Sequence, residues 1–378
     1  MESLDLSILN TSVPTVAAAL GVSPLRLKGA LTCYALSQAL LIPISAWLTD
    51  RHGTRRVFAA AIAVFSAGSL LCGISTTVPA LVCARVIQGM GGAMMMPVGR
   101  VAILRTFPKT QLIRAMSFVV IPGMVGPLLG PVVGGVLTEL VHWRAIFLVN
   151  LPIGLLGLRA ALRIMPDYRS DAREPLDVAG FLLFGGGIAS LSHGLGLVSD
   201  RTAARAELLG WIVCGAALLA LYARHAASHP RPLLRPGILR TRTYRVAISG
   251  GFLSRLGIAG MPFLLPLLYQ VGLGRTPLQS ALLMLPQPAA AISTKLLQQR
   301  VIARVGYRRL LQANTLLIGL AICAFSTITA TTPGWRIGAL AFAYGILTSL
   351  QFTSVHSLQY ADIEPPDTSM ASTVASVV

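Results

Sequence analysis

The chain has 378 residues, of which 54% are hydrophobic and only 12% are charged, and its mean hydropathy is +0.72. This composition is too apolar for a water-soluble protein of this length and predicts a polytopic membrane protein. The net charge of +18 does not indicate nucleic acid as a partner, because the Lys and Arg residues lie in short loops between apolar runs, where they mark membrane topology.

Apolar runs that are long enough to cross a bilayer as helices recur along the chain, whereas barrel strands would be about half as long. Residues 1–20 are mostly apolar but carry Asp5 and Pro14, and we expect an incomplete first span there. A last apolar piece opens near Ser369 and stops at Val378. Between these ends we expect eleven complete spans, at 29–48, 57–75, 78–99, 116–138, 145–164, 178–198, 208–223, 246–269, 277–294, 310–330 and 337–358.

Most of the 31 Lys and Arg residues fall on one side of these spans, and the positive-inside rule makes that side cytoplasmic. Two basic, Pro-containing breaks at 166–175 and 225–244 are predicted cytoplasmic linkers. They divide the chain into a six-helix half at 1–165, a segment of linkers and two extra helices at 166–244, and a second half at 245–378, in which we expect the last two helices to be largely missing.

The turn between the first two complete spans is rich in charge and carries Asp50, Arg51, Gly53, Arg55 and Arg56. A carboxylate at the end of one helix can pair with arginines across a helix contact, and such a pair can form or break as two halves rock. Gly53 permits the tight turn. We therefore interpret these residues as a gate, with a solvated basic loop that only sets topology as the alternative.

A weaker copy of this turn follows 253 residues later, where Gly306 corresponds to Gly53 and the pair Arg308 and Arg309 to the earlier arginine pair. Ala303 stands where the first copy has its aspartate. An internal repeat in a membrane protein predicts a transporter built from two pseudo-symmetric halves.

Two ionisable residues lie within the N-terminal apolar runs. Arg85 is costly there unless it faces a wet cavity or a partner, and a side chain that extends to the membrane surface is the alternative. Gly89 and Gly92 allow close helix packing on the same face. Asp5 lies in a low-dielectric span that favours its neutral form, so it is a candidate proton carrier, with an interfacial acid as the alternative.

Glycines spaced by four residues mark the fifth predicted span, which holds Gly126, Gly130, Pro131, Gly134 and Gly135. The spacing places Gly126, Gly130 and Gly134 on one helix face, where they favour close packing, and Pro131 weakens the backbone hydrogen bonds. A simple packing face is the alternative to a functional helix.

Polar side chains in other spans are candidate substrate contacts, and we name Asn10, Gln88 and Arg255 for this role. The five cysteines lie singly in apolar runs, are interpreted as small buried hydrophobes, and show no paired spacing that could hold zinc. We predict neither a metal site nor a cofactor. The chain also lacks a phosphate-binding loop and the common hydrolase motifs, so we predict a gradient-driven transporter and not an enzyme.

Together these motifs resemble the major facilitator superfamily, and within it the fourteen-helix drug:proton antiporters of the EmrB/QacA type. The strings 4–14, 46–56, 85–92 and 126–135 are similar to the group's motifs in helix one, the following loop, helix four and helix five, and 142–154 is similar to its entry into helix six. Departures are Ala46, Thr54 and Ser117, which replace the usual residues of these motifs, and Ala303 in the second half.

The resemblance implies two pseudo-symmetric helical bundles plus two extra central helices, in the cytoplasmic (inner) membrane. It also implies export of small, often lipophilic molecules in exchange for protons, with Asp5 and Arg85 in coupling and Asp50, Arg51 and Arg55 in gating. One alternative hypothesis is a gradient-driven transporter of a polar or anionic metabolite, which Arg255 and Asn10 would contact. Another is a truncated, non-transporting remnant. The sequence identifies neither the substrate nor a periplasmic adaptor.

Overall fold

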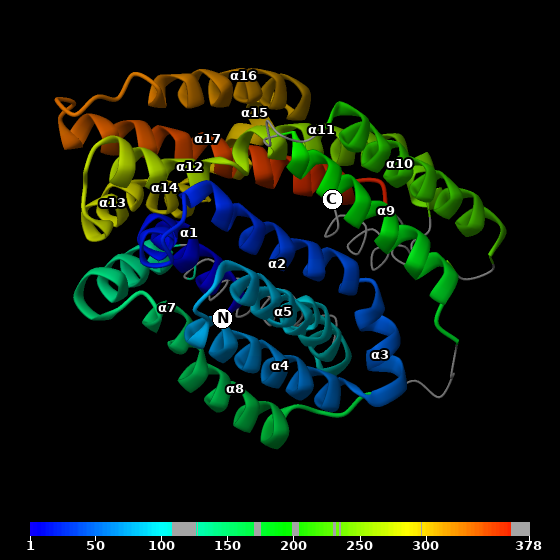
Figure 1. The fold of residues 1–378 in the computed structure, drawn as a ribbon. Helices are drawn as coiled ribbons and strands as arrows, with labels where there is room; N and C mark the ends of the chain where they lie inside the picture. The colour runs from blue at the N-terminus through cyan, green and yellow to red at the C-terminus, as the bar shows by residue number, and fades with distance from the viewer. Residues whose placement is uncertain are drawn as a thin grey trace.

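The computed structural model describes residues 1–107, 126, 128–169, 175–198, 204–229, 232–233, 236–295 and 297–363. Across these ranges every regular element is a helix, and no strand occurs. Figure 1 shows the helices of the first half below those of the second half, with α9 and α10 along one side of the molecule.

The first half is a bundle around the long helix α5. Thr77 caps α5, because its hydroxyl accepts a hydrogen bond from the N–H of Ala80. A helix at 128–136 ends in a π-turn, Leu137–Val141. The other elements are α1 (Glu2–Ala19), a 3₁₀ turn (Pro24–Leu27), α2 (Lys28–Leu41), α3 (Ile44–His52), α4 (Thr54–Ile74), α5 (Val78–Thr106), α7 (Ala145–Leu148) and α8 (Asn150–Ile164).

The two extra helices and the second half follow in sequence. α9 (Val178–Leu197) and α10 (Arg205–Ser228) form a hairpin, and Gly185 of α9 lies against Leu40 of α2. The second half comprises a 3₁₀ turn (Pro236–Arg240), α11 (Arg242–Ile258), α12 (Met261–Leu267), a π-turn (Leu268–Gly272), α13 (Pro277–Met284), α14 (Pro286–Thr294), α15 (Gln298–Val305), α16 (Tyr307–Phe325) and α17 (Gly334–Tyr360).

Eight described helices are long and apolar enough to cross a membrane, and the bent pair of α2 and α3 raises this number to nine. The spans expected at 29–48 and 277–294 are each divided into two helices. Pro43 and Pro286 stand at the breaks, where a residue without a backbone N–H interrupts the helical hydrogen bonds, and the first break bends the chain by 56°. Most of the span expected at 116–138 lies outside the described residues.

The repeated turn has the same backbone conformation in both halves. Gly53 (φ 91°, ψ 151°) separates α3 from α4, and Gly306 (φ 76°, ψ 153°) separates α15 from α16. Each glycine N–H donates to a carbonyl four residues earlier, in both cases at 2.9 Å. The correspondence of Gly306 with Gly53 that the sequence predicts is therefore confirmed as a structural repeat.

Glycines also allow the helices around α5 and α17 to approach closely. A Cβ atom on Gly89 would clash with Ser37 of α2, and one on Gly345 of α17 would clash with the carbonyl group of Gln287 in α14. Since no side chain separates these backbones, the pair α2 and α5 in the first half and the pair α14 and α17 in the second pack in the same manner.

The cysteines differ from the expectation of uniformly buried residues. Cys72 is buried and Cys33 is half-buried, whereas Cys83, Cys214 and Cys323 are exposed on outer helix faces. An apolar side chain on such a face contacts lipid tails, which are as apolar as a protein core, so its exposure costs little.

The two halves contact each other at the ends where the cation-poor loops lie. Gln270 Nε2 donates to the carbonyl oxygen of Thr11 at 2.7 Å, and the N–H of Leu278 donates to Glu139 Oε2 at 2.9 Å. The positive-inside rule makes the cation-poor side the outer side of the membrane, so the contact between Glu139 and Leu278 joins the two halves on that side.

The two glycine turns predict different costs for alanine. Gly53→Ala and Gly306→Ala both place a Cβ atom in a backbone region that only glycine adopts readily, at a cost of about 1–3 kcal/mol. At Gly53 the added atom also clashes with Asp167 and Arg169, whereas nothing lies within 4 Å of it at Gly306. We expect the larger fall in apparent melting temperature for Gly53→Ala in detergent-purified protein, and equal falls would contradict this account of the turn.

Candidate functional site

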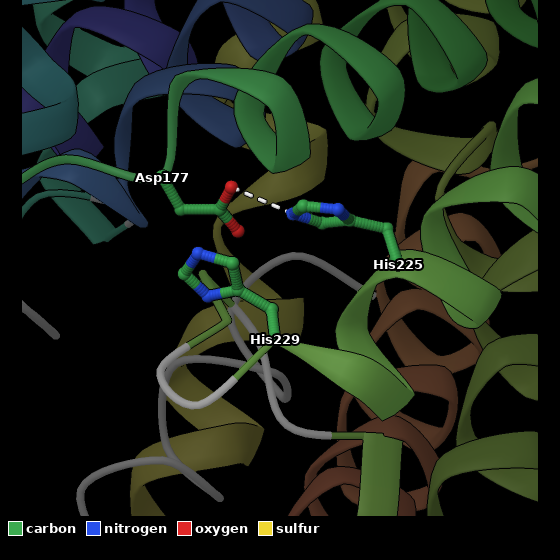
Figure 2. Close-up of side chains that lie close together, drawn as sticks. All are labelled: Asp177, His225 and His229. Atoms are coloured by element: carbon green, nitrogen blue, oxygen red, sulfur yellow. Dashed lines mark hydrogen bonds and ion pairs between the residues drawn. The ribbon is translucent and has the colours of Figure 1, made fainter.

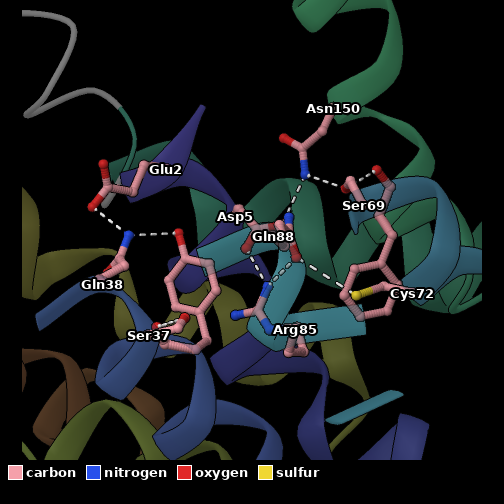
Figure 3. Close-up of polar contacts among 11 residues, drawn as sticks. Glu2, Asp5, Ser37, Gln38, Ser69, Cys72, Arg85, Gln88 and Asn150 are labelled. Carbon is pink, nitrogen blue, oxygen red and sulfur yellow. Dashed lines mark hydrogen bonds and ion pairs between the residues drawn. The ribbon is translucent and has the colours of Figure 1, made fainter. Parts of the chain in front are cut away.

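A buried ion pair joins the first helix to the fifth. Arg85 Nη1 lies 2.5 Å from Asp5 Oδ2, and the two side chains are 0% and 1% exposed. Figure 3 shows the pair at the centre of a polar cluster in the first half. This burial excludes an Arg85 side chain that extends to the membrane surface, which was the alternative at that position.

The guanidinium of Arg85 has two further neighbours. Its Nη1 also donates to Gln88 Oε1 at 2.7 Å, and its Cζ lies 4.0 Å from the ring centroid of Tyr34 in α2. A cation above an aromatic ring is attracted by the negative face of the ring. Arg85 therefore has a carboxylate, an amide oxygen and a ring face as partners.

The carboxylate of Asp5 is held at both oxygens. Gln88 Nε2 donates to Asp5 Oδ1 at 2.9 Å, and Asn150 Nδ2 donates to the same oxygen at 2.8 Å (Figure 3). Asn150 Nδ2 also lies 3.1 Å from Ser69 Oγ, whose hydroxyl donates to the carbonyl oxygen of Phe147. The site therefore draws on α1, α4, α5 and α8, and these contacts hold Asp5 in one position.

A second carboxylate lies close to this cluster. Gln38 Nε2 donates to Glu2 Oε1 at 2.8 Å and to the hydroxyl oxygen of Tyr34 at 3.0 Å. Tyr34 thus contacts Arg85 through its ring and Gln38 through its hydroxyl group. A chain of contacts through Gln38 and Tyr34 of α2 therefore links Glu2 to Arg85 in the Asp5 site.

The glycine-rich helix packs directly on the helix that carries Asp5. A Cβ atom added to Gly126, Gly130 or Gly134 would clash with or crowd Ser3, Ser7 and Ile8 of α1 in turn. Gly135 faces the other way, toward Leu278 of α13. The buried Pro131 lies in the same helix, which therefore packs on the Asp5 helix with one face and on α13 of the second half with another.

The predicted gate residues do not form one cluster. Asp50 Oδ1 lies 3.4 Å from Nη2 of Arg105 at the end of α5, and both side chains are about half exposed, at 46% and 40%. Arg51 and Arg55, which the resemblance also assigns to gating, have other partners. Arg51 lies over the ring of Trp47 at 5.4 Å, and Arg56 is exposed.

Arg55 and Thr54 hold the segment that follows α8. Arg55 Nε donates to the carbonyl oxygen of Met165 at 2.6 Å, and its N–H donates to Asp167 Oδ1 at 3.2 Å. The Thr54 hydroxyl donates to the carbonyl oxygen of Pro166 at 2.7 Å. The turn therefore ties α4 to the start of the predicted linker at 166–175.

The three predicted substrate contacts lie apart. Gln88 belongs to the Asp5 cluster, and Asn10 is half-buried on the same helix as Asp5. Arg255 lies in α11 of the second half, where its charge acts on His356 together with those of Lys295 and Arg100. The structure does not bring Asn10 and Arg255 into one site.

An apolar cavity of about 600 Å³ lies elsewhere, between the 3₁₀ turn before α2 and the second half. Its walls include Leu25, Met261, Leu265, Leu268 and Phe325, and none of the three predicted contacts lines it.

Sequence reasoning missed four residues of the Asp5 cluster as site residues: Tyr34, Gln38, Ser69 and Asn150. Each is a polar side chain inside an apolar run, and such residues usually face the interior of a helix bundle. A polar residue inside an apolar run is therefore the signal that could have identified these residues, for example Asn150. This signal does not distinguish a site residue from a residue that only forms a hydrogen bond within its own helix, as Ser37 does with the carbonyl oxygen of Tyr34.

An all-α chain of membrane-spanning helices, with a repeated helix turn in its two halves and a buried ion pair in one of them, defines a membrane transporter. The family model described as Major Facilitator Superfamily matches residues 1–378. The chain belongs to the major facilitator superfamily.

Similar curated proteins bear the name multidrug resistance protein MdtD. The protein of Serratia proteamaculans (strain 568) is 38% identical over 378 residues, which is 100% of this chain and 79% of that protein. The protein of Klebsiella pneumoniae (strain 342) is 39% identical over 380 residues, which is 80% of its length. These similarities make the chain a multi-pass inner-membrane transporter of small molecules.

Solved structures support the fold alone. The POT family transporter PepTSo has a TM-score of 0.66 and 13% identity, covering 100% of this chain and 86% of that one. A peptide transporter POT in complex with sulfate has a TM-score of 0.68 and 14% identity, covering 99% and 84%. The major facilitator fold expected from the sequence motifs is therefore confirmed.

The buried pair predicts a non-additive effect on stability. Asp5→Asn leaves the Arg85 charge buried without its counter-charge, which costs about 3–5 kcal/mol. Adding Arg85→Gln removes the uncompensated charge, so the double variant should unfold at a higher temperature than Asp5→Asn alone. Thermal unfolding of both single variants and the double variant in detergent completes the cycle. Strictly additive losses would contradict a direct interaction.

Proposed function

We propose that this protein exports small, lipophilic or drug-like compounds across the cytoplasmic membrane in exchange for protons, by alternating access of its two halves. The observation that carries the proposal is the buried contact between Asp5 and Arg85, because an ionisable pair inside a membrane span is most often part of an ion or proton pathway.

A proton and Arg85 compete for the same carboxylate. With Asp5 ionised, its charge attracts the guanidinium, and Gln88 and Asn150 donate to its other oxygen. A proton on Asp5 removes that charge, so the attraction falls to that of a neutral hydrogen bond. Arg85 then keeps Gln88 and the Tyr34 ring as partners. Protonation thus weakens the link between α1 and α5.

The position of α1 connects this event to the movement of the halves. Its N-terminal part carries Asp5, while its C-terminal part accepts the hydrogen bond from Gln270 of the second half through Thr11. A change in how α1 packs on α5 therefore acts on a contact between the two halves. A proton on Asp5 favours one arrangement of the halves to the extent that it binds that arrangement more tightly.

We further propose the domain organisation that this cycle needs. Residues 1–165 form the half that carries the proton site, 166–244 connect the halves through two extra helices, and 245–378 form the second half. The repeated turn at Gly53 and Gly306 supports this division, as does the matching helix packing around α5 and α17.

The proposed class of cargo rests on the relatives and on one cavity. Proteins named for multidrug resistance are 38% identical to this chain over its whole length. The cavity between the 3₁₀ turn and the second half is lined almost entirely by apolar side chains, including Leu25 and Phe325, which suit a lipophilic compound.

A second candidate function is gradient-driven transport of an anionic metabolite. Arg255 lies within α11 of the second half, and a cation inside a membrane span most often faces a substrate or ion pathway. Such a charge suits an anionic group. Competition against dye efflux distinguishes the two candidate functions. Anionic metabolites should reduce dye efflux only if the protein also transports them, whereas lipophilic compounds should reduce it under the leading proposal.

The coupling role of Asp5 predicts a specific loss of transport. In everted membrane vesicles with an imposed pH gradient, Asp5→Asn should reduce gradient-driven efflux of a fluorescent dye to the level of vesicles without the protein, because the carboxamide cannot take up a proton. The matched control is Glu207→Gln, which removes a carboxylate from an exposed position on α10. Gradient-driven efflux by Asp5→Asn at the wild-type rate would overturn the coupling role.

The contact between Asp50 and Arg105 predicts that these residues act together. We expect Arg105→Ala and Asp50→Asn to reduce dye efflux to a similar degree, and their combination to cause no further loss. Stability should change little, since exposed ion pairs contribute about 0–1 kcal/mol. Arg309→Ala in the corresponding turn of the second half is the control. Wild-type efflux by Arg105→Ala would show that the contact has no role in gating.

A further inference from the structure

Three metal-ligating side chains converge where the α9 and α10 hairpin meets the linkers. Asp177 is the residue just before α9, while His225 and His229 lie one helical turn apart at the end of α10. Figure 2 shows the carboxylate with the ring of His225 beside it and the ring of His229 below it. One ligand atom from each residue lies within 4.8 Å of those of the other two.

The contacts of Asp177 orient its carboxylate toward the histidines. The N–H of Gly180 donates to Oδ1 at 2.8 Å, and the N–H of Leu233 lies 3.3 Å from Oδ2. His225 Nε2 lies 2.8 Å from Oδ1. The carboxylate side chain is only 4% exposed, and backbone groups on both sides of the hairpin hold it.

Asp177 is anionic at neutral pH. Burial opposes ionisation, but the hydrogen bonds from Gly180, His225 and Leu233 outweigh it, and the pKa of Asp177 is lowered. The charge is therefore present without a metal ion and is also the capping group of α9, since a side-chain oxygen that accepts an N–H three residues later completes the first turn.

The donor set suits a divalent transition metal. Zinc is bound at about 2.0–2.2 Å by histidine nitrogen and carboxylate oxygen, and three protein ligands leave one position for water. Tetrahedral geometry at those lengths separates the ligand atoms by about 3.3 Å. The three ligand atoms lie within 4.8 Å of one another, and small side-chain rotations bring them to that separation. His225 Nε2 then binds the metal in place of Asp177 Oδ1. Two histidines make magnesium a poor match, because it prefers oxygen ligands.

We propose that Asp177, His225 and His229 form a binding site for a divalent transition metal of the zinc class. The sequence-based prediction contained no metal ligands, because these three residues do not form a local metal-binding motif. Asp177 and His225 are separated by 48 residues, and only the hairpin brings them together.

The place of the site indicates what the metal does. One ligand ends the linker that leads into α9, and two lie at the end of α10, where the chain leaves for the second half. A bound metal ion therefore fastens the start of the hairpin to its end, on the side rich in Lys and Arg. The site stabilises the connection between the two halves and does not depend on the proposed transport cycle.

The test uses the full-length protein in detergent with any affinity tag removed. Zn²⁺ is titrated against a chromophoric chelator, and we expect a single site whose affinity falls by about 10- to 100-fold or more in His229→Ala and in His225→Ala. The matched control is His193→Ala in α9, where the imidazole packs on Trp211 and contacts no ligand of the site. Mg²⁺ should not compete.

Asp177→Asn is the decisive variant, because its amide oxygen keeps the cap of α9 while it loses the anionic ligand. Zn²⁺ should raise the apparent melting temperature of the wild-type protein, and this rise should be lost in Asp177→Asn and in His229→Ala. Asp5→Asn should bind Zn²⁺ as the wild type does, which separates this site from the transport pathway. Wild-type Zn²⁺ affinity in His225→Ala and His229→Ala, or no binding by the wild-type protein, would overturn the proposal.

Discussion

The contact between Asp5 and Arg85 constrains the whole first half. Two opposite charges buried at 1% and 0% exposure are tolerated in an apolar interior only if they stay together and their remaining donors and acceptors find partners. Gln88, Asn150 and the Tyr34 ring supply some of those partners from three helices, whereas Nε and Nη2 of Arg85 are buried without a hydrogen-bond partner among the described residues. Glycines bring the helices close enough, at Gly89 between α5 and α2, and at Gly130 between the glycine-rich helix and α1. The polar contacts of Asp5 and Arg85 thus depend on the close helix packing that these glycines allow.

The repeat is symmetric in backbone and asymmetric in chemistry. Gly53 and Gly306 adopt the same conformation, and α17 packs on α14 as α5 packs on α2. A polar cluster of the second half contains only uncharged side chains, because Asn314 Nδ2 donates to Gln351 Oε1 and Gln351 Nε2 donates to Ser254 and Thr315. A neutral cluster has no charge that a proton could cancel. This difference supports a cycle in which the first half handles protons and the second half moves with it.

The segment that connects the two halves makes specific contacts with the helices beside it. The turn after α3 holds the start of the 166–175 linker through Arg55 and Thr54, and Asp177 closes the hairpin of extra helices against His225. The chain between the halves is therefore fastened at both of its described ends. A metal ion at Asp177 would strengthen the second of these attachments without touching the Asp5 cluster.

The sequence by itself determined the class of the molecule, because long apolar runs and the distribution of Lys and Arg are local properties that directly report membrane spans. It also placed Asp5, Arg85 and the repeated glycine turn, since a charge or a glycine in such a run is unusual wherever the chain goes. Only the tertiary structure decided which groups meet. Asp5 and Arg85 are 80 residues apart, Asp50 pairs with Arg105, and Asp177 lies beside His225 and His229. Helix packing sets those distances, and a single sequence does not encode them in any local pattern.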